Sequence, residues 1–132
     1  MRGLAYCYVS LWLLTTPLGA QGTIVRDTTR LGIAYDVRGA GPPVVLIHGA
    51  VLDRRMWDYD ASALATRFRV IRYDLRGHGA SADITKPFDP SDDLLSVLDA
   101  VGATRAHLVG LSAGGGLALD FALSHPHRGA RL

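Results

Sequence analysis

The sequence predicts an α/β fold, in which a mostly parallel sheet carries helices on both of its faces. Residues 44–47 (VVLI) form an unbroken aliphatic run, which is typical of a strand covered on both faces in a parallel sheet. Two further strands are predicted at residues 69–74 and 105–109, and helical segments separate the three strands. Strands that alternate with helices pair in parallel and pack the helices on both faces of one sheet.

Length and composition limit the class of protein. The chain has 132 residues, which is the size of one domain. Apolar residues make up 48% and charged residues 20%, a balance that excludes a disordered or multi-spanning membrane chain. The formal net charge is +2, and no run of Lys or Arg is long enough to follow a phosphate backbone. We therefore expect no nucleic-acid partner.

The amino end has the three parts of a secretory signal peptide. A basic start (MR) precedes an apolar stretch at residues 4–14 and a small-residue segment (PLGA) that is suited to cleavage. We expect a signal peptide at residues 1–20, cleaved after Ala20 or alternatively after Gly22. The apolar stretch is shorter than the about 20 residues that span a bilayer, and an uncleaved anchor is the alternative.

Removal of the signal peptide defines the mature chain. The expected domain then occupies residues 21–132, and the protein is secreted or periplasmic, with no membrane contact after cleavage. The only cysteine, Cys7, lies in the apolar stretch, so we expect no disulfide in the mature chain. The sequence makes no prediction of the oligomeric state.

The first half of the domain is expected to begin with two strands. Residues 23–26 and 31–37 are predicted as strands joined by a polar turn. The second strand alternates in polarity and is expected to be a half-buried edge, with its apolar side chains at Leu31, Ile33, Tyr35 and Val37. After the buried strand at 44–47, residues 56–66 are predicted to form the first helix.

The second half contains two predicted helices and one strand. We expect Ser91 to cap a helix whose positive end is favoured by Asp92 and Asp93, and Gly102 to end it. Its apolar face is expected to belong to the core, through Leu94, Leu95, Leu98 and Val101. The strand at 105–109 is followed by a helix predicted over about residues 113–123.

A glycine-rich turn follows each of the three predicted parallel strands. The third, GLSAG at residues 110–114, is a G-x-S-x-G pattern at a strand-to-helix junction. Such a junction turns sharply and pushes the serine side chain out at the carboxyl edge of the sheet. Glycines on either side let the two backbones approach. We expect Gly115 and Gly116 also to serve close packing beneath this turn, because glycine within a helix is otherwise unfavourable.

Three segments together resemble the α/β-hydrolase family: VVLIHGA, YDLRGHGAS and VGLSAGG, in the family's order and spacing. The resemblance extends over nearly the whole expected domain and implies an α/β-hydrolase-like fold that is truncated after the nucleophile helix. It also implies a serine hydrolase that acts on an ester-like (acyl) bond of a small-molecule substrate, without metal or cofactor.

The resemblance implies a role for individual residues. Ser112 matches the nucleophile, and the backbone N–H groups of Ala50 and Ala113 match the oxyanion hole. In the family the turn that carries the serine, here residues 110–114, is called the elbow, and the loop after the first parallel strand, here residues 48–50, is called the oxyanion loop. Support for these two segments is implied for His48, Gly49, Gly110 and Gly114. The loop after the strand at 69–74 is expected to be pinned by Asp74, Arg76 and His78, with no catalytic step for any of them.

The triad acid and base are expected to be absent from this chain. In the family both follow the serine along the sequence, and only 20 residues follow Ser112. Asp120 and His125 lie on or just after the predicted helix, about 12 and 20 Å along its axis from Ser112. Neither reaches the serine hydroxyl, so the chain is expected to be the amino half of a hydrolase.

Other interpretations of the same residues remain open. Ser112 also fits a simple helix cap. A non-catalytic remnant or binding module would keep the floor of the pocket without a triad. Dinucleotide binding is the less favoured alternative, because Gly110, Gly114 and Gly116 fit the G-x-x-x-G-x-G spacing of short-chain dehydrogenases. That fingerprint should open the fold and precede an acidic residue about 20 positions on, whereas here it closes the chain.

Overall fold

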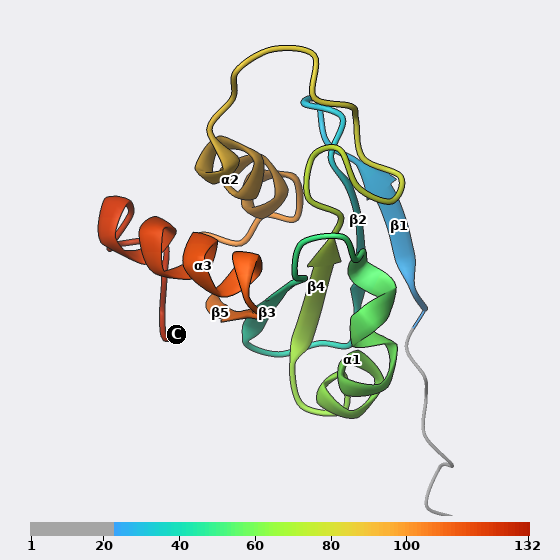
Figure 1. Ribbon diagram of the computed structural model, residues 1–132. Helices are drawn as coiled ribbons and strands as arrows, with labels where there is room; N and C mark the ends of the chain where they lie inside the picture. Colours follow the sequence, from blue (N-terminus) through green and yellow to red (C-terminus); the bar gives the residue numbers. More distant parts are fainter. Residues whose placement is uncertain (1–22) are drawn as a thin grey trace, which may run out of the picture.

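The computed structural model describes residues 23–132 (Figure 1). The expected signal peptide at residues 1–20, with Cys7 and the cleavage sites, lies outside the described residues and stays a prediction. The described chain forms one five-stranded sheet in the order β1-β2-β4-β3-β5. Its strands are β1 (Val25–Thr28), β2 (Ala34–Arg38), β3 (Pro43–Ile47), β4 (Arg69–Tyr73) and β5 (His107–Gly110).

The sheet is mixed, with a parallel half that carries the glycine turns. β3 pairs in parallel with β4 and β5, whereas β2 pairs antiparallel with β1 and β4. The α/β class is therefore confirmed, with an antiparallel part beside the parallel strands. A short turn joins β1 to β2, and a connection of this kind forms an antiparallel pair, whereas parallel neighbours need a longer crossover.

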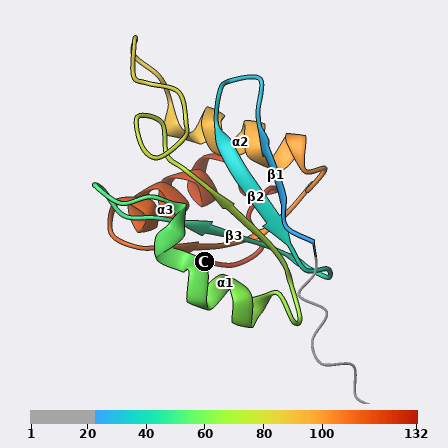
Figure 2. The same cartoon turned by 90° about the vertical axis from the view of Figure 1, so that its right-hand side faces the viewer.

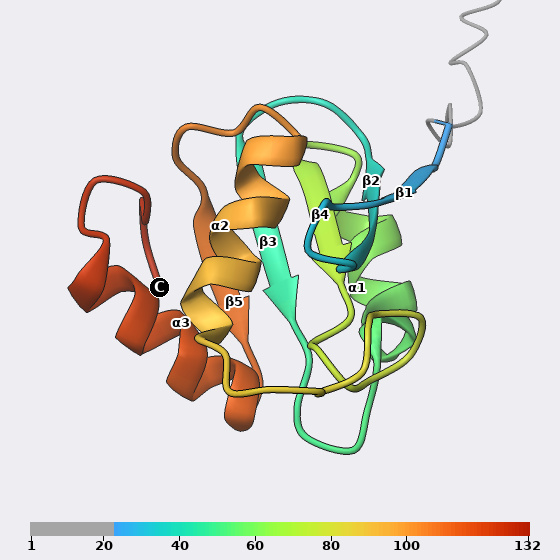
Figure 3. The same cartoon turned by 90° about the horizontal axis from the view of Figure 1, so that it is seen from above.

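Helices cover both faces of the sheet (Figures 2 and 3). They are a 3-10 turn η1 (Arg54–Trp57), followed by α1 (Asp58–Leu64), α2 (Pro90–Ala100) and α3 (Ala113–Ser124). α1 packs on one face, against Val44, Leu46 and Val70, whereas α2 and α3 pack on the other, against Val45, Ile47 and Ile71. Within residues 23–132, no helix is both long and apolar enough to cross a bilayer.

Two local expectations about these elements are wrong. β2 is an inner strand and not an edge, because β1 and β4 pair with it on its two sides. It is also covered on both faces, since Asp36 is buried and binds the Arg72 guanidinium. Ser91 does not cap α2. The Asp89 carboxylate accepts the Ser91 N–H at 2.8 Å, and Pro90 is the first helical residue. A proline at that position fits because the first turn of a helix has no use for its missing N–H.

Tyr73 has a hydroxyl in the main core, between the sheet and the helices α2 and α3, that lacks a hydrogen-bond partner among the described residues. The residue is fully buried at the end of β4, and its Oη atom has no hydrogen-bond partner among the described residues. Burial raises the pKa of the Tyr73 hydroxyl, and the charge of Asp93 raises it further. A buried polar group without a partner costs about 1–3 kcal/mol of desolvation.

We expect Tyr73→Phe to raise the free energy of unfolding by about 1 kcal/mol, because phenylalanine keeps the ring and removes the unpaired hydroxyl. Urea unfolding of the purified chain measures this change. Tyr35→Phe on β2 is the matched control and should leave the stability nearly unchanged, since its hydroxyl is not enclosed in this way. A loss of stability in Tyr73→Phe would contradict the interpretation.

Candidate active site

Ser112 lies at the junction of β5 and α3 in a backbone conformation that L-residues rarely adopt. Its φ is 52° and its ψ is −113°, and its side chain is exposed. Such a conformation costs about 1–3 kcal/mol and persists only where the surrounding structure imposes it. The Ser112 side chain makes no capping hydrogen bond to α3. The helix-cap interpretation is therefore wrong, and the hydroxyl is free at the carboxyl edge of the sheet.

Close backbone contact forces this turn. A Cβ atom at Gly110 would overlap the carbonyl of Gly114, and one at Gly114 would overlap the carbonyls of Ile47 and His48 at the end of β3. Gly115 is also tight, because its Cβ would lie 3.2 Å from the Gly110 oxygen. Gly116 faces open space, so the expectation of close packing is wrong there, and nothing in the structure explains this glycine.

The loop after β3 contacts the elbow and brings Ala50 to the same edge. Leu111 N–H donates to the Ile47 oxygen at 3.1 Å, and a Cβ at Gly49 would lie 3.4 Å from the Leu111 oxygen. Among the described residues, neither the Ala50 N–H nor the Ala113 N–H donates a hydrogen bond. Two unused donors therefore accompany the serine hydroxyl, as an oxyanion hole requires.

His48 orients the peptide that carries one of these donors. The side chain is fully buried, and its Nε2 accepts the Leu75 N–H at 2.9 Å. Its Nδ1 lies 2.7 Å from the Gly49 carbonyl oxygen and must carry the proton, because a carbonyl only accepts. In a trans peptide the C=O and the following N–H point in opposite directions. Binding the Gly49 oxygen inward therefore turns the Ala50 N–H outward.

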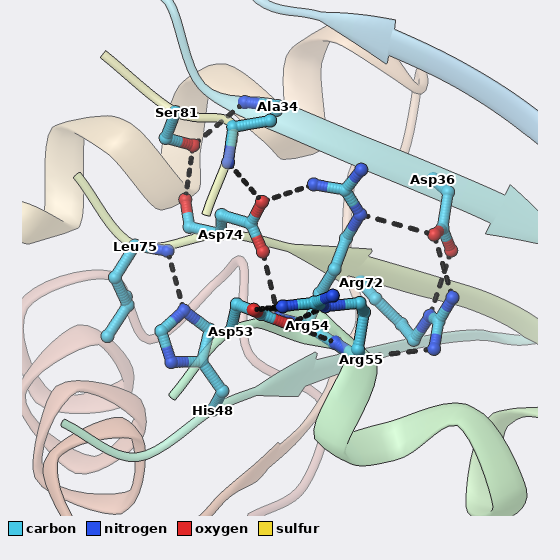
Figure 4. A network of polar contacts seen from close by, with 11 residues as sticks. Ala34, Asp36, His48, Asp53, Arg54, Arg55, Arg72, Asp74, Leu75 and Ser81 are labelled. Atoms are coloured by element: carbon cyan, nitrogen blue, oxygen red, sulfur yellow. Dashed lines mark hydrogen bonds and ion pairs between the residues drawn. The ribbon is translucent and has the colours of Figure 1, made fainter. Parts of the chain in front are cut away.

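Asp74 ties the loop after β3 to the loop after β4 (Figure 4). Its carboxylate accepts the Arg54 N–H at 2.8 Å and the Ala80 N–H at 2.9 Å, and it also binds the Arg54 guanidinium. Beneath it, Arg72 binds Asp36 through two hydrogen bonds of 2.9 and 2.7 Å. These buried charges hold both loops at fixed positions on the sheet.

The sequence did not reveal two features of the loop after β3. Asp53 accepts hydrogen bonds from the Arg55 side chain and backbone, which lower the pKa of Asp53 to about 2. This carboxylate therefore stays charged until the pH falls to about 2, and it keeps the start of η1 in place. Val51, directly after Ala50, has a φ of 58° and is 93% exposed. A β-branched residue in this region is rare and carries no sequence signal.

The loop after β4 is pinned as expected, through partners that the sequence did not indicate. Arg76 binds Asp93 of α2 at 2.5 and 3.0 Å, so Asp93 serves this ion pair and not only the helix end. The ring of His78 lies 5.3 Å from that of His48, and its Nδ1 lies 3.0 Å from the Arg76 oxygen. The two side chains join α2 and the loop after β3 to one turn.

No acid–base pair reaches Ser112 within the described residues. His125 caps the far end of α3, where it stacks on Phe121 at 4.7 Å and lies 2.9 Å from the Ser124 hydroxyl. Asp120 is exposed on the same helix. Neither makes a hydrogen bond to the Ser112 hydroxyl. In residues 23–132 no group of three or more His, Cys, Asp or Glu side chains is placed to hold a metal ion.

Known proteins are similar to this chain in both sequence and structure. Residues 44–132 match the model of the alpha/beta hydrolase family. A Caulobacter segnis protein that has been assigned the name carbamate hydrolase RutD is 40% identical over 110 residues, which are 76% of this chain and 41% of that protein. The chain thus spans about two fifths of the length of such relatives and corresponds to their amino-terminal part.

Solved structures of hydrolases are also similar to the chain. A hydrolase from Pseudomonas aeruginosa PA01 is 39% identical with a TM-score of 0.74, over 84% of this chain and 44% of that one. Est816, described as an N-acyl homoserine lactone degrading enzyme, is 36% identical with a TM-score of 0.71, over 74% of this chain and 39% of that one. The sequence match, the sheet topology and the elbow lead to one conclusion: the chain belongs to the alpha/beta hydrolase family.

Proposed function

We propose that the complete protein is a serine hydrolase that cleaves an ester-like (acyl) bond in a small molecule, with Ser112 as its nucleophile. The observation that carries the proposal is the strained, exposed Ser112, whose hydroxyl is used neither as a cap nor in any other hydrogen bond of the described chain. Strained residues of this kind cluster at active sites.

In the proposed chemistry the serine is the nucleophile, and backbone N–H groups stabilise the charge that forms. The Ser112 oxygen attacks the acyl carbon while its proton passes to a base, and negative charge collects on the former carbonyl oxygen. The N–H groups of Ala50 and Ala113 stabilise this charge. Collapse of the intermediate breaks the bond to the leaving group, which takes the proton from the base and departs as an alcohol or amine. Water then releases the acid from the serine. The base must come from polypeptide outside residues 23–132.

The relatives support this class of bond. The name of the Caulobacter segnis protein refers to a carbamate, and Est816 is described as acting on a lactone. A structure 32% identical to the chain, with a TM-score of 0.70, is an enol-lactonase from Burkholderia xenovorans LB400. All three substrates contain a carbonyl carbon bonded to oxygen or nitrogen. A non-catalytic binding module stays as the second candidate, because no acid–base pair lies at hydrogen-bond distance from Ser112 within residues 23–132.

We expect Ser112→Ala to reduce the hydrolysis of activated esters by the complete protein by at least about 10³-fold, because the nucleophile is lost. The measurement is kcat/KM for a p-nitrophenyl ester. Ser124→Ala, at the other end of α3, is the matched control and should keep full activity, since its hydroxyl bonds only to its own helix and to His125. Equal rates in Ser112→Ala and the wild type would exclude the proposed nucleophile.

His48→Leu should lower kcat by about 10²-fold and leave KM nearly unchanged, because the Ala50 N–H loses its orientation and acts mainly on the transition state. Steady-state kinetics of the complete protein separate the two constants. The matched control is His127→Leu, an exposed position near the end of the described chain. If His48→Leu raised KM and kept kcat, the role assigned to this side chain would be wrong.

A further inference from the structure

Arginines gather at the edge of the sheet where the parallel strands begin. Three segments lead into β3, β4 and β5 at this edge: residues 38–43, 65–69 and 101–106. They contain no aspartate or glutamate, and they carry four arginines: Arg38, Arg67, Arg69 and Arg105. The formal net charge of the whole chain is only +2, so this edge is more basic than the rest of the chain. We call these three segments the basic edge.

Close contacts hold the three segments of the basic edge side by side. A Cβ atom at Gly41 would overlap the Arg67 carbonyl, so the first segment lies directly against the second. The Arg69 guanidinium donates to the Val101 carbonyl oxygen at 2.6 Å, which joins the second segment to the third. The basic edge is therefore one continuous surface that is fixed by the sheet, although its residues are distant from one another along the chain.

The charges of these four arginines are not neutralised by a carboxylate of the described chain. The ion pairs within residues 23–132 use other arginines: Arg54, Arg55, Arg72, Arg76 and Arg128. Arg38 donates to the Ser62 hydroxyl at 3.1 Å, and Arg105 donates to the Gly129 carbonyl at 3.0 Å. Both acceptors are neutral, so the positive charge of the basic edge is available to a surface of opposite sign.

Two exposed apolar side chains lie beside the basic edge. Ile24 is 37% exposed and Val25 is 56% exposed. Val25 pairs with Val37, the residue before Arg38, at the start of β1. β1 and β4 begin at the same edge, which is the lower end of the sheet in Figure 1. Basic and aliphatic side chains on one surface are typical of contact with lipid headgroups and the adjoining acyl carbons.

We propose that the basic edge, together with Ile24 and Val25, binds a bilayer that contains anionic phospholipids. Near such a surface each arginine strengthens binding by roughly fivefold. A bilayer fits this surface better than a nucleic acid does, because the two aliphatic side chains would meet hydrocarbon there. The proposal differs from the expectation of no membrane contact after cleavage, since the sequence alone does not bring the four arginines together.

Binding by this edge leaves the candidate site open. Ser112 and Ala50 lie where β5 and β3 end, whereas the basic edge lies where the same strands begin. A bilayer against the basic edge therefore does not cover the Ser112 hydroxyl. The proposal concerns binding, and it does not depend on whether Ser112 is a nucleophile.

Sedimentation with vesicles tests the proposal on the complete protein, produced from residue 21 onward so that the apolar stretch at residues 4–14 cannot contribute. We expect the protein to sediment with vesicles of phosphatidylcholine and phosphatidylglycerol, and not with vesicles of phosphatidylcholine alone. Salt at about 1 M should release it, because the Debye length then falls to about 3 Å. Equal sedimentation with both kinds of vesicle, or with neither, would overturn the proposal.

Two double variants locate the binding surface. Arg67→Glu with Arg105→Glu reverses two exposed charges of the basic edge and should weaken binding to the anionic vesicles at least about tenfold. Arg30→Glu with Lys86→Glu is the matched control, because both residues are exposed near the opposite edge and the change in net charge is the same. The control should bind nearly as the wild type does, and circular dichroism verifies that both variants fold.

Two results would contradict the proposed surface. An equal loss of vesicle binding in both double variants would mean that only the net charge matters. Binding to duplex DNA but not to anionic vesicles, with fluorescence anisotropy as the measurement, would assign the arginines to a nucleic acid instead.

Discussion

The contact between the start of α3 and the ends of β3 and β5 is the constraint on which the candidate site depends. Because Gly114 lies against the carbonyls of β3 and Gly110 lies against Gly114, the chain must reverse within a few residues. That reversal holds Ser112 in the left-handed region and exposes its side chain. The strain is sustained by the burial of α3, through Ala118 and Phe121, in the main core.

A second constraint fixes the loop that faces the elbow. A loop of backbone donors is useful in catalysis only if its N–H groups are held before the charge develops. Here the Gly49 peptide is fixed by His48, and the loop is anchored through Arg54 to Asp74. A buried ion pair such as Asp36–Arg72 contributes little net stability over an apolar pair of the same size. Its evident contribution is geometric, because it aligns β2, β4 and η1.

Local patterns made the fold class and the elbow predictable, whereas distant pairings were not. The VVLI strand and the end of α2 at Gly102 each depend on neighbours within a few residues. The turn at Ser112 also depends on the distant carbonyls of β3, but its G-x-S-x-G pattern marks it in the sequence. The partner of Asp36 lies 36 residues away, so the alternation in β2 did not reveal that its polar face is buried. The prediction of an edge was wrong because β1 also pairs with β2. Val51 gave no signal at all, since its left-handed backbone follows from the loop's anchors and not from its side chain.

The described residues contain one part of the proposed acyl-transfer site. The proposed nucleophile and the proposed oxyanion donors are built from turns within one part of the sheet, and they need only backbone contacts and buried charges to keep their geometry. A base needs a side chain at hydrogen-bond distance from Ser112, and no such residue is present from 23 to 132. An oxyanion hole without its triad retains about 10³- to 10⁴-fold catalysis over water. In the proposed mechanism the base must therefore lie at the carboxyl edge of the sheet, where the parallel strands end and Ser112 is exposed.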